Sequence, residues 1–159
     1  MSVDAVTQKI ISKIQEGANF ILANFANPDM VGHTGNRQAA IVALQAVDRN
    51  LGLIYEATQK AGAALVITAD HGNVEAIFDT RSGGINKEHS MNPVPFILAA
   101  PCFLRSKILV KGYVELAEIV PEGVLSDVSP TILEIMGVAK PAEMSAESLV
   151  PILLKQIQP

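Results

Sequence analysis

The sequence predicts an α/β fold in which a mainly parallel sheet is flanked by helices. The prediction rests on helical segments that alternate with short apolar runs. The composition, with 49% hydrophobic and only 18% charged residues, argues against a disordered chain. Strands that alternate with helices are joined by right-handed crossovers, and such connections make neighbouring strands parallel. The length of 159 residues favours one domain. We therefore expect a single domain that spans residues 1–159.

The first part of the chain predicts a helix, a strand and a second helical turn. Ser2 or Asp4 can cap a helix that runs to about residue 16. The apolar run at residues 20–25 is too short for another helix and predicts a strand buried on both faces. Asn27-Pro28 then provides an N-cap followed by a residue suited to the first helical position.

The rest of the chain continues this alternation. In order, we expect a helix over residues 38–60, a buried strand over 63–68, a polar loop over 79–92, a strand over 94–100, a helix within 124–137, and a loop with a short helix over 139–159. The long helix follows from apolar residues at alternating spacings of four and three. The strands follow from short continuous apolar runs.

The composition excludes several classes of function. The formal net charge is −4 and aromatic residues make up 4%, whereas nucleic-acid binding needs a basic face or an aromatic stacking surface. No apolar run approaches the ~20 residues of a membrane-spanning helix, and residues 1–14 lack the pattern of a secretory signal. The single cysteine, Cys102, excludes an intrachain disulfide and fits a reducing compartment. We therefore expect a cytoplasmic protein that binds neither nucleic acid nor membrane.

Asp29 and His33 are the first pair of candidate metal ligands. They are four residues apart, so a helical turn that begins at Asn27 would place both side chains on one face. A carboxylate and an imidazole in that position can share a divalent cation. The alternative is that Asp29 only complements the positive end of the helix and that His33 is solvated.

Asp70 and His71 directly follow the predicted strand over residues 63–68. In open α/β sheets, binding sites lie beyond the carboxyl ends of the strands. Gly72 would allow the sharp backbone turn that brings both side chains to one ion. The alternative is a turn that simply leads out of the strand.

His89 lies in the loop that leads into the strand over residues 94–100. A lone histidine in a loop is more often structural or solvated. However, all three histidines of the chain and two aspartates lie beside predicted strands, so we expect them to converge. Oxygen and imidazole ligands suit Mn²⁺ or Zn²⁺. Two such ions about 3.5–4 Å apart would suit phosphoryl transfer, because they neutralise the attacking and leaving oxygens.

Three motifs carry a resemblance to a known family: NFANPDMVGHTGN at residues 24–36, ITADHGN at 67–73 and EHSMNPVPF at 88–96. In this order and spacing they closely resemble the cofactor-independent phosphoglycerate mutases, a family of the alkaline phosphatase superfamily. Residues 123–144 resemble the C-terminal end of that family. The resemblance implies an alkaline-phosphatase-like fold, of which this chain would be the C-terminal, incomplete part. It also implies a metal-dependent isomerase of glycolysis, which interconverts 3-phosphoglycerate and 2-phosphoglycerate through a serine nucleophile at two Mn²⁺ ions.

The same resemblance implies roles for individual residues. It assigns Asp29, His33 and His89 to one ion, and Asp70 and His71 to half the ligand set of the other. Mn²⁺ is the expected metal, with Zn²⁺ or Mg²⁺ as alternatives. No serine of this chain matches the motif of the nucleophile, so we assign no catalytic residue and expect little mutase activity from this chain alone. The implied partners are phosphoglycerate and an N-terminal partner chain or a second copy.

Two other functions stay open at this point. The first is a metal-dependent phosphatase or related hydrolase of the same superfamily. The second is a non-catalytic metal-binding assembly module, since a sheet without its neighbouring strands exposes edges and apolar surface. The motif at residues 24–36 favours the mutase over the phosphatase, because it is more specific to that family than the metal ligands alone.

Overall fold

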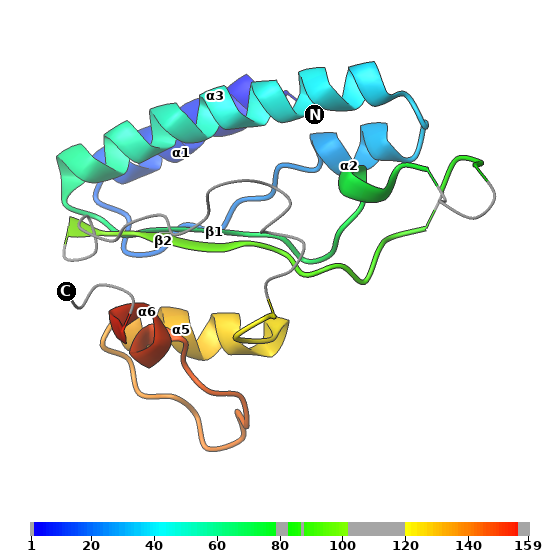
Figure 1. Cartoon of the computed structure of the whole chain (residues 1–159). Helices are drawn as coiled ribbons and strands as arrows, with labels where there is room; N and C mark the ends of the chain where they lie inside the picture. The colour runs from blue at the N-terminus through cyan, green and yellow to red at the C-terminus, as the bar shows by residue number, and fades with distance from the viewer. Residues whose placement is uncertain (1, 79–82, 87, 102–119, 156–159) are drawn as a thin grey trace. The chain divides into compact units, whose positions relative to one another are not determined.

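The computed structural model describes residues 2–78, 83–86, 88–101 and 120–155 (Figure 1). The chain divides into two compact units, Met1–Pro101 and Cys102–Pro159, which we describe separately. The first unit contains α1 (Val3–Gln15), α2 (Asn27–Gly32), α3 (Arg37–Ala61), β1 (Leu65–Thr68), the 3-10 helix η1 (Val74–Ala76) and β2 (Phe96–Ala99). The second contains the 3-10 helix η3 (Leu125–Asp127), α5 (Val128–Ile135) and α6 (Val150–Lys155). The presence of both helices and a sheet is as predicted. Cys102 lies outside the described residues. Among the described helices, none combines the length and the apolar character that crossing a bilayer requires.

The two long helices begin and end where local sequence signals favour it. Ser2 caps α1, because its hydroxyl accepts a hydrogen bond from the backbone N–H of Ala5 at 3.4 Å. Asn36 caps α3 in the same way, with the N–H of Ala39 at 3.0 Å. α3 ends at Gly62, whose φ of 66° is a left-handed conformation that favours glycine. The helices predicted over residues 2–16 and 38–60 are therefore confirmed to within about a residue or two.

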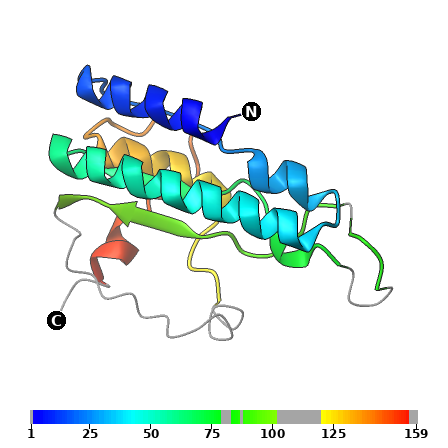
Figure 2. The ribbon, with the colours of Figure 1, turned by 90° about the horizontal axis from the view of Figure 1, so that it is seen from above.

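α1 and α3 pack side by side (Figures 1 and 2). The buried side chains of the pair are Val3, Thr7 and Ile10 of α1 and Ala40, Asn50, Ile54 and Thr58 of α3. The buried amide of Asn50 donates to Asp4 Oδ1 at 3.0 Å and to the Ala46 carbonyl at 2.9 Å, so its burial is compensated by hydrogen bonds. α2 also packs against α3. The helix pair therefore supports the short helix that contains Asp29 and ends at His33.

β1 and β2 pair in antiparallel orientation, so the predicted parallel arrangement is wrong for the strands that the structure describes. The register pairs Leu65 with Ala99, Val66 with Leu98, Ile67 with Ile97 and Thr68 with Phe96. A parallel pair needs a crossover connection, usually an α-helix. The chain between β1 and β2 instead folds back as a long hairpin, with further antiparallel bridges at Gly72–Ser90 and Phe78–Ile85. Its one described helix is the short η1.

The predicted strand over residues 20–25 is also wrong. This segment forms neither a helix nor a strand, and it pairs with no strand among the described residues. The side chains of Phe20 and Leu22 are 54% and 85% exposed, and that of Ile97 in β2 is 49% exposed. An apolar run becomes a buried strand only where neighbouring strands and helices cover it, and the described residues do not supply that cover.

Thr131 fixes α5 within the second unit. Its side chain is fully buried, donates a hydrogen bond to the Asp127 carbonyl at 2.6 Å, and accepts one from the Leu149 N–H at 2.8 Å. The Asp127 carboxylate adds to this link, because it accepts from the N–H of Val124 at 2.9 Å and of Glu147 at 3.2 Å. These bonds hold the start of α5 against the chain that precedes α6.

Thr131→Val is expected to lower the free energy of local opening around α5 by about 1–3 kcal/mol, because the N–H of Leu149 loses its acceptor. Native-state hydrogen exchange of the α5 amides measures this opening directly. Thr131→Ser is the control, since it keeps the hydroxyl and loses only a methyl group. Equal protection of the α5 amides in the valine and serine variants would contradict the prediction.

Candidate metal centre

Asp29 and His33 are placed by α2. The helix begins with Pro28 in its first turn, where the missing N–H of proline is not needed. Asp29 and His33 follow one helical turn apart, and His33 is the C-terminal cap. The predicted helical turn is confirmed, but Asn27 is not its N-cap. Ala26 already has helical dihedral angles (φ −74°, ψ 0°) and occupies that position.

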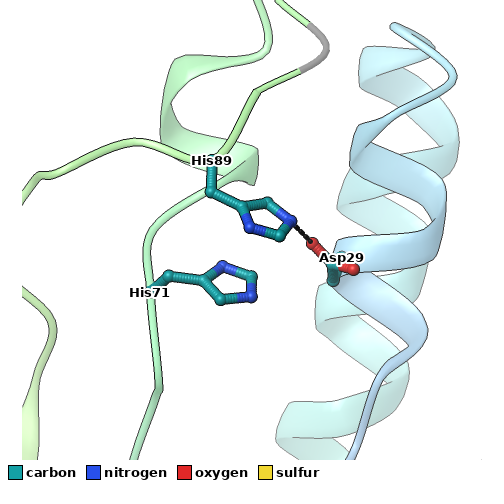
Figure 3. Close-up of side chains that lie close together, drawn as sticks. All are labelled: Asp29, His71 and His89. Carbon is teal, nitrogen blue, oxygen red and sulfur yellow. Dashed lines mark ion pairs between the residues drawn. The ribbon is translucent and has the colours of Figure 1, made fainter.

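His71 and His89 lie on the two arms of the hairpin that joins β1 to β2 (Figure 3). The arms are bridged where the N–H of Ser90 donates to the Gly72 carbonyl at 2.9 Å. As a result, the two imidazole rings stack with their centroids 3.6 Å apart and their planes 10° from parallel. The antiparallel hairpin therefore brings together histidines that are far apart in sequence.

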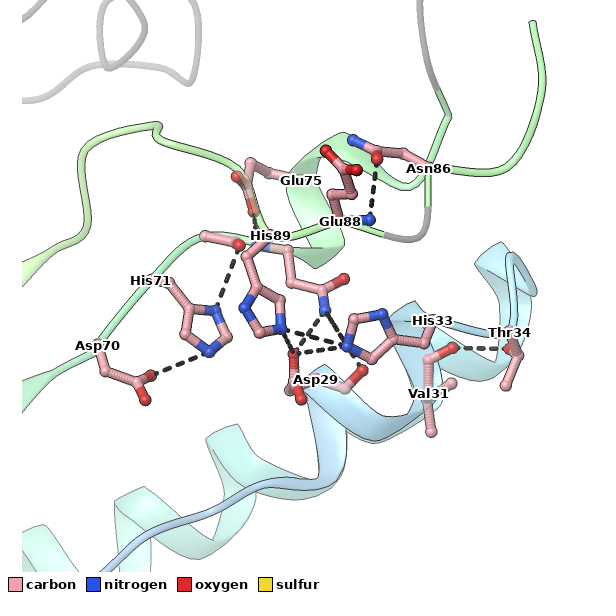
Figure 4. Close-up of polar contacts among 12 residues, drawn as sticks. Asp29, Val31, His33, Thr34, Asp70, His71, Glu75, Asn86, Glu88 and His89 are labelled. Atoms are coloured by element: carbon pink, nitrogen blue, oxygen red, sulfur yellow. Dashed lines mark hydrogen bonds and ion pairs between the residues drawn. The ribbon is translucent and has the colours of Figure 1, made fainter.

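Asp29, His33 and His89 converge on one point (Figure 4). Asp29 Oδ1 lies 3.3 Å from His33 Nε2 and 3.2 Å from His89 Nε2. The two Nε2 atoms lie 3.2 Å apart. Donor atoms that each lie about 2.1 Å from one tetrahedral ion are about 3.4 Å from one another. The three donor atoms thus have the separations that a shared divalent ion requires.

His71 belongs to the same cluster, whereas Asp70 lies at its edge. One donor atom from each of Asp29, His71 and His89 lies within 4.8 Å of the other two. The side chain of Asp70 is 84% exposed, and its Oδ1 is 3.6 Å from His71 Nε2. The expected convergence of the three histidines around Asp29 is therefore present in the structure. The division of the five residues between two ions stays a prediction.

The carboxylate of Asp29 supplies the negative charge of this cluster. Burial opposes its ionisation, but a hydrogen bond from Asn73 and the nearby imidazoles of His33, His89 and His71 outweigh that effect and lower the pKa of Asp29. Asp29 is therefore ionised at neutral pH, which is the form that binds a metal ion.

Asn73 is a residue of this site that sequence reasoning missed. Its side chain is buried, and its Nδ2 donates to Asp29 Oδ1 at 2.5 Å and lies 3.4 Å from His33 Nε2. Gly32 makes room for this amide, because a Cβ at Gly32 would lie 2.2 Å from Asn73 Oδ1. The signal that could have identified Asn73 was its place at the end of the ITADHGN motif. It orients the aspartate and fixes α2 against the hairpin.

The family model described as the metalloenzyme superfamily matches residues 1–140. This chain belongs to the metalloenzyme superfamily. The matched range contains all five predicted ligands, from Asp29 to His89. Membership of this superfamily agrees with a cluster of one half-buried carboxylate and three imidazoles.

Proteins with sequences similar to this chain are named 2,3-bisphosphoglycerate-independent phosphoglycerate mutase. The proteins of Agrobacterium fabrum and Nostoc punctiforme are 45% and 46% identical over 150 residues, and each match covers 94% of this chain and 27% of the relative. The Cyanothece protein is 41% identical over 160 residues, which are 100% of this chain and 29% of the relative. The resemblance to this family that the three motifs carry is confirmed, whereas the placement of the chain at the C-terminal end of the family stays a prediction. The chain spans little more than a quarter of the length of these relatives.

A solved structure has a similar fold. It is the phosphoglycerate mutase of Leishmania mexicana, determined at low cobalt concentration. The TM-score is 0.72 at 26% sequence identity, and the match covers 91% of this metalloenzyme chain and 27% of the mutase chain. The predicted fold class is confirmed by this similarity, although the described sheet has two strands only.

Proposed function

We propose that this chain is the metal-binding part of a cofactor-independent phosphoglycerate mutase, which interconverts 3-phosphoglycerate and 2-phosphoglycerate in glycolysis. The observation that carries the proposal is the convergence of Asp29, His33 and His89, whose donor atoms lie 3.2–3.3 Å apart. Identity of 41–46% to proteins named as such mutases supports it. A glycolytic role also supports the expected cytoplasmic location.

The donor set fits a divalent cation, for which Mn²⁺ is our first proposal and Zn²⁺ or Mg²⁺ the alternatives. One carboxylate oxygen with imidazole nitrogens suits such ions better than thiol-preferring metals. Asp29, His33 and His89 would hold one ion, and Asp70 and His71 would contribute to the second. When bound, the ions would neutralise the charge on the oxygens of the transferred phosphoryl group. The cobalt used for the Leishmania mexicana structure supports a metal ion of this kind.

The side chains of this cluster have distinct tasks in the proposed site. Asp29 provides the anionic ligand, and Asn73 keeps one of its oxygens in place through the 2.5 Å hydrogen bond. The imidazoles would bind the ion through ring nitrogens that carry no proton. The side chain of His89 is 45% exposed, which leaves the cluster accessible to a phosphorylated substrate.

We propose that the serine nucleophile and the residues that bind the substrate lie outside this sequence, either in a partner chain or in further sequence of the same protein. None of the serines matches the family's nucleophile motif, and the hydroxyl of Ser90, beside His89, donates to Glu75. The exposed side chains of Phe20 and Leu22 support such an association, because they offer apolar surface for it.

A chimeric enzyme tests the mutase proposal. When this chain replaces the matching 150-residue segment of the Agrobacterium fabrum protein, we expect conversion of 3-phosphoglycerate to 2-phosphoglycerate, measured by coupling to enolase. His33→Ala in the chimera is expected to lower the turnover by at least about 100-fold, because it removes a proposed ligand. A folded, Mn²⁺-loaded chimera without mutase turnover would contradict the proposal.

The isolated chain is the companion measurement. We expect Mn²⁺ uptake at micromolar concentration and no mutase turnover. Turnover by the isolated chain that His33→Ala abolishes would refute the proposed dependence on other polypeptide. Hydrolysis of p-nitrophenyl phosphate by an otherwise inactive chimera would favour the phosphatase, and Mn²⁺ uptake with neither activity would favour the assembly module.

A further inference from the structure

Glu75 connects the two arms of the histidine-bearing hairpin. Its Oε2 accepts a hydrogen bond from the backbone N–H of Asn73 at 2.8 Å, on the arm that follows β1. Its Oε1 accepts from the hydroxyl of Ser90 and from Asn92 Nδ2, the latter at 3.0 Å. Ser90 directly follows His89 in the sequence. In Figure 4 the side chain of Glu75 lies above that of His89. One carboxylate therefore holds together the two loop segments that carry the hairpin histidines.

Gly72 allows this connection to be close. A Cβ at Gly72 would lie 2.2 Å from Ser90 Oγ and 2.3 Å from Glu75 Oε1. The hydroxyl and the carboxylate thus occupy the space that any larger residue would need. This packing indicates that the contact is a built feature of the hairpin and not a chance encounter of exposed side chains.

The connection extends from the hairpin to α2. The backbone N–H of Asn73 donates a hydrogen bond to the Glu75 carboxylate. The side-chain amide of the same asparagine donates to Asp29 Oδ1 at 2.5 Å. Burial opposes the ionisation of Glu75, but hydrogen bonds from Ser90, from backbone N–H groups and from Asn92 outweigh it and lower the pKa of Glu75. The ionised carboxylate is the stronger hydrogen-bond acceptor.

We propose that Glu75 is a positioning residue of the candidate metal centre. It acts through Ser90 on His89 and through Asn73 on Asp29, and it keeps their donor atoms at the separation that one divalent ion needs. Its relevance to catalysis rests on the proposed function, but the positioning itself is measurable without metal. Groups that support metal ligands commonly contribute about 10- to 100-fold to metal affinity.

Two measurements on the same chain test the role of Glu75. In the metal-free parent, the stacked rings of His71 and His89, 3.6 Å apart, are expected to give nuclear Overhauser effects between their ring protons. Glu75→Gln is expected to remove these effects and to raise the Kd for Mn²⁺ about 10- to 100-fold. The reason is that the NH₂ group of the new glutamine would face groups that donate hydrogen bonds to Glu75, namely Asn73 N–H, the Ser90 hydroxyl and Asn92 Nδ2. Glu56→Gln, at an exposed glutamate of α3, is the matched control and should change neither quantity.

A second pair of variants keeps the test decisive if Glu75→Gln does not fold. Ser90→Ala removes one bond to Glu75 and should weaken both the ring contacts and Mn²⁺ binding, whereas Ser90→Thr keeps the hydroxyl and should restore them. Ring contacts and Mn²⁺ affinity that neither Glu75→Gln nor Ser90→Ala changes would overturn the proposal. So would the absence of ring contacts in the parent. Ring contacts that depend on Glu75 in a parent that takes up no Mn²⁺ would support the positioning role and refute the proposed metal site.

Discussion

Asp29→Asn is expected to weaken Mn²⁺ binding by about 100-fold or more, a larger effect than removal of any supporting group. The reason lies in the position of Asp29 Oδ1, which is 3.3 Å from His33 Nε2 and 3.2 Å from His89 Nε2. It is also the carboxylate of the group formed by Asp29, His71 and His89, whose donor atoms lie within 4.8 Å of one another. The amide keeps the shape of the side chain but removes the charge that attracts the cation. Titration with Mn²⁺, followed by electron paramagnetic resonance or calorimetry, measures the loss.

Asp70→Asn is the matched control for this substitution. It makes the same chemical change at an aspartate that is also a predicted ligand, but the side chain of Asp70 is 84% exposed and lies at the edge of the cluster. We expect the first Mn²⁺ ion to bind Asp70→Asn with nearly unchanged affinity. Equal losses in the two variants, or unchanged binding by Asp29→Asn, would show that Asp29 is not the central ligand.

Gly32→Ala is expected to lower the free energy of unfolding of the first unit by about 1–3 kcal/mol, as overpacking of a close contact does. A Cβ at Gly32 would lie 2.2 Å from Asn73 Oδ1, 2.9 Å from Asn73 Cγ and 3.1 Å from Val74 Cγ1. The amide of Asn73 can avoid the methyl group only by turning, and it would then lose its hydrogen bond to Asp29. We therefore expect a loss of Mn²⁺ affinity together with the loss of stability. Urea unfolding followed by circular dichroism and Mn²⁺ titration measure the two effects.

Gly52→Ala is the control for the glycine substitution, and its effect should have the opposite sign. Gly52 lies inside α3, and a Cβ there would meet nothing within 4 Å. Alanine in a helix interior is favoured over glycine by about 0.5–1 kcal/mol, so this variant should be more stable than the parent with unchanged Mn²⁺ binding. A Gly32→Ala protein that matches the parent in both quantities would refute the close packing of α2 against Asn73.

The helices of this protein were predictable because their signals are local. The caps at Ser2 and Asn36 and the stop at Gly62 act within a few residues of the helix ends. The sheet was not predictable in the same way. An apolar run such as residues 20–25 has strand character, but strand formation depends on a partner elsewhere, and the orientation of β1 and β2 depends on the path of the loop between them.

The candidate site shows the same contrast between local and long-range information. Two aspartates and three histidines, in motifs of a recognisable family, predict a divalent metal centre from their residue types alone. The folded structure shows that Asp29 is the central carboxylate, that Asp70 lies at the edge, and that Asn73 orients the aspartate. Ligand chemistry belongs to single side chains, whereas separations of about 3 Å between donors arise from packing α2 against a hairpin distant in sequence.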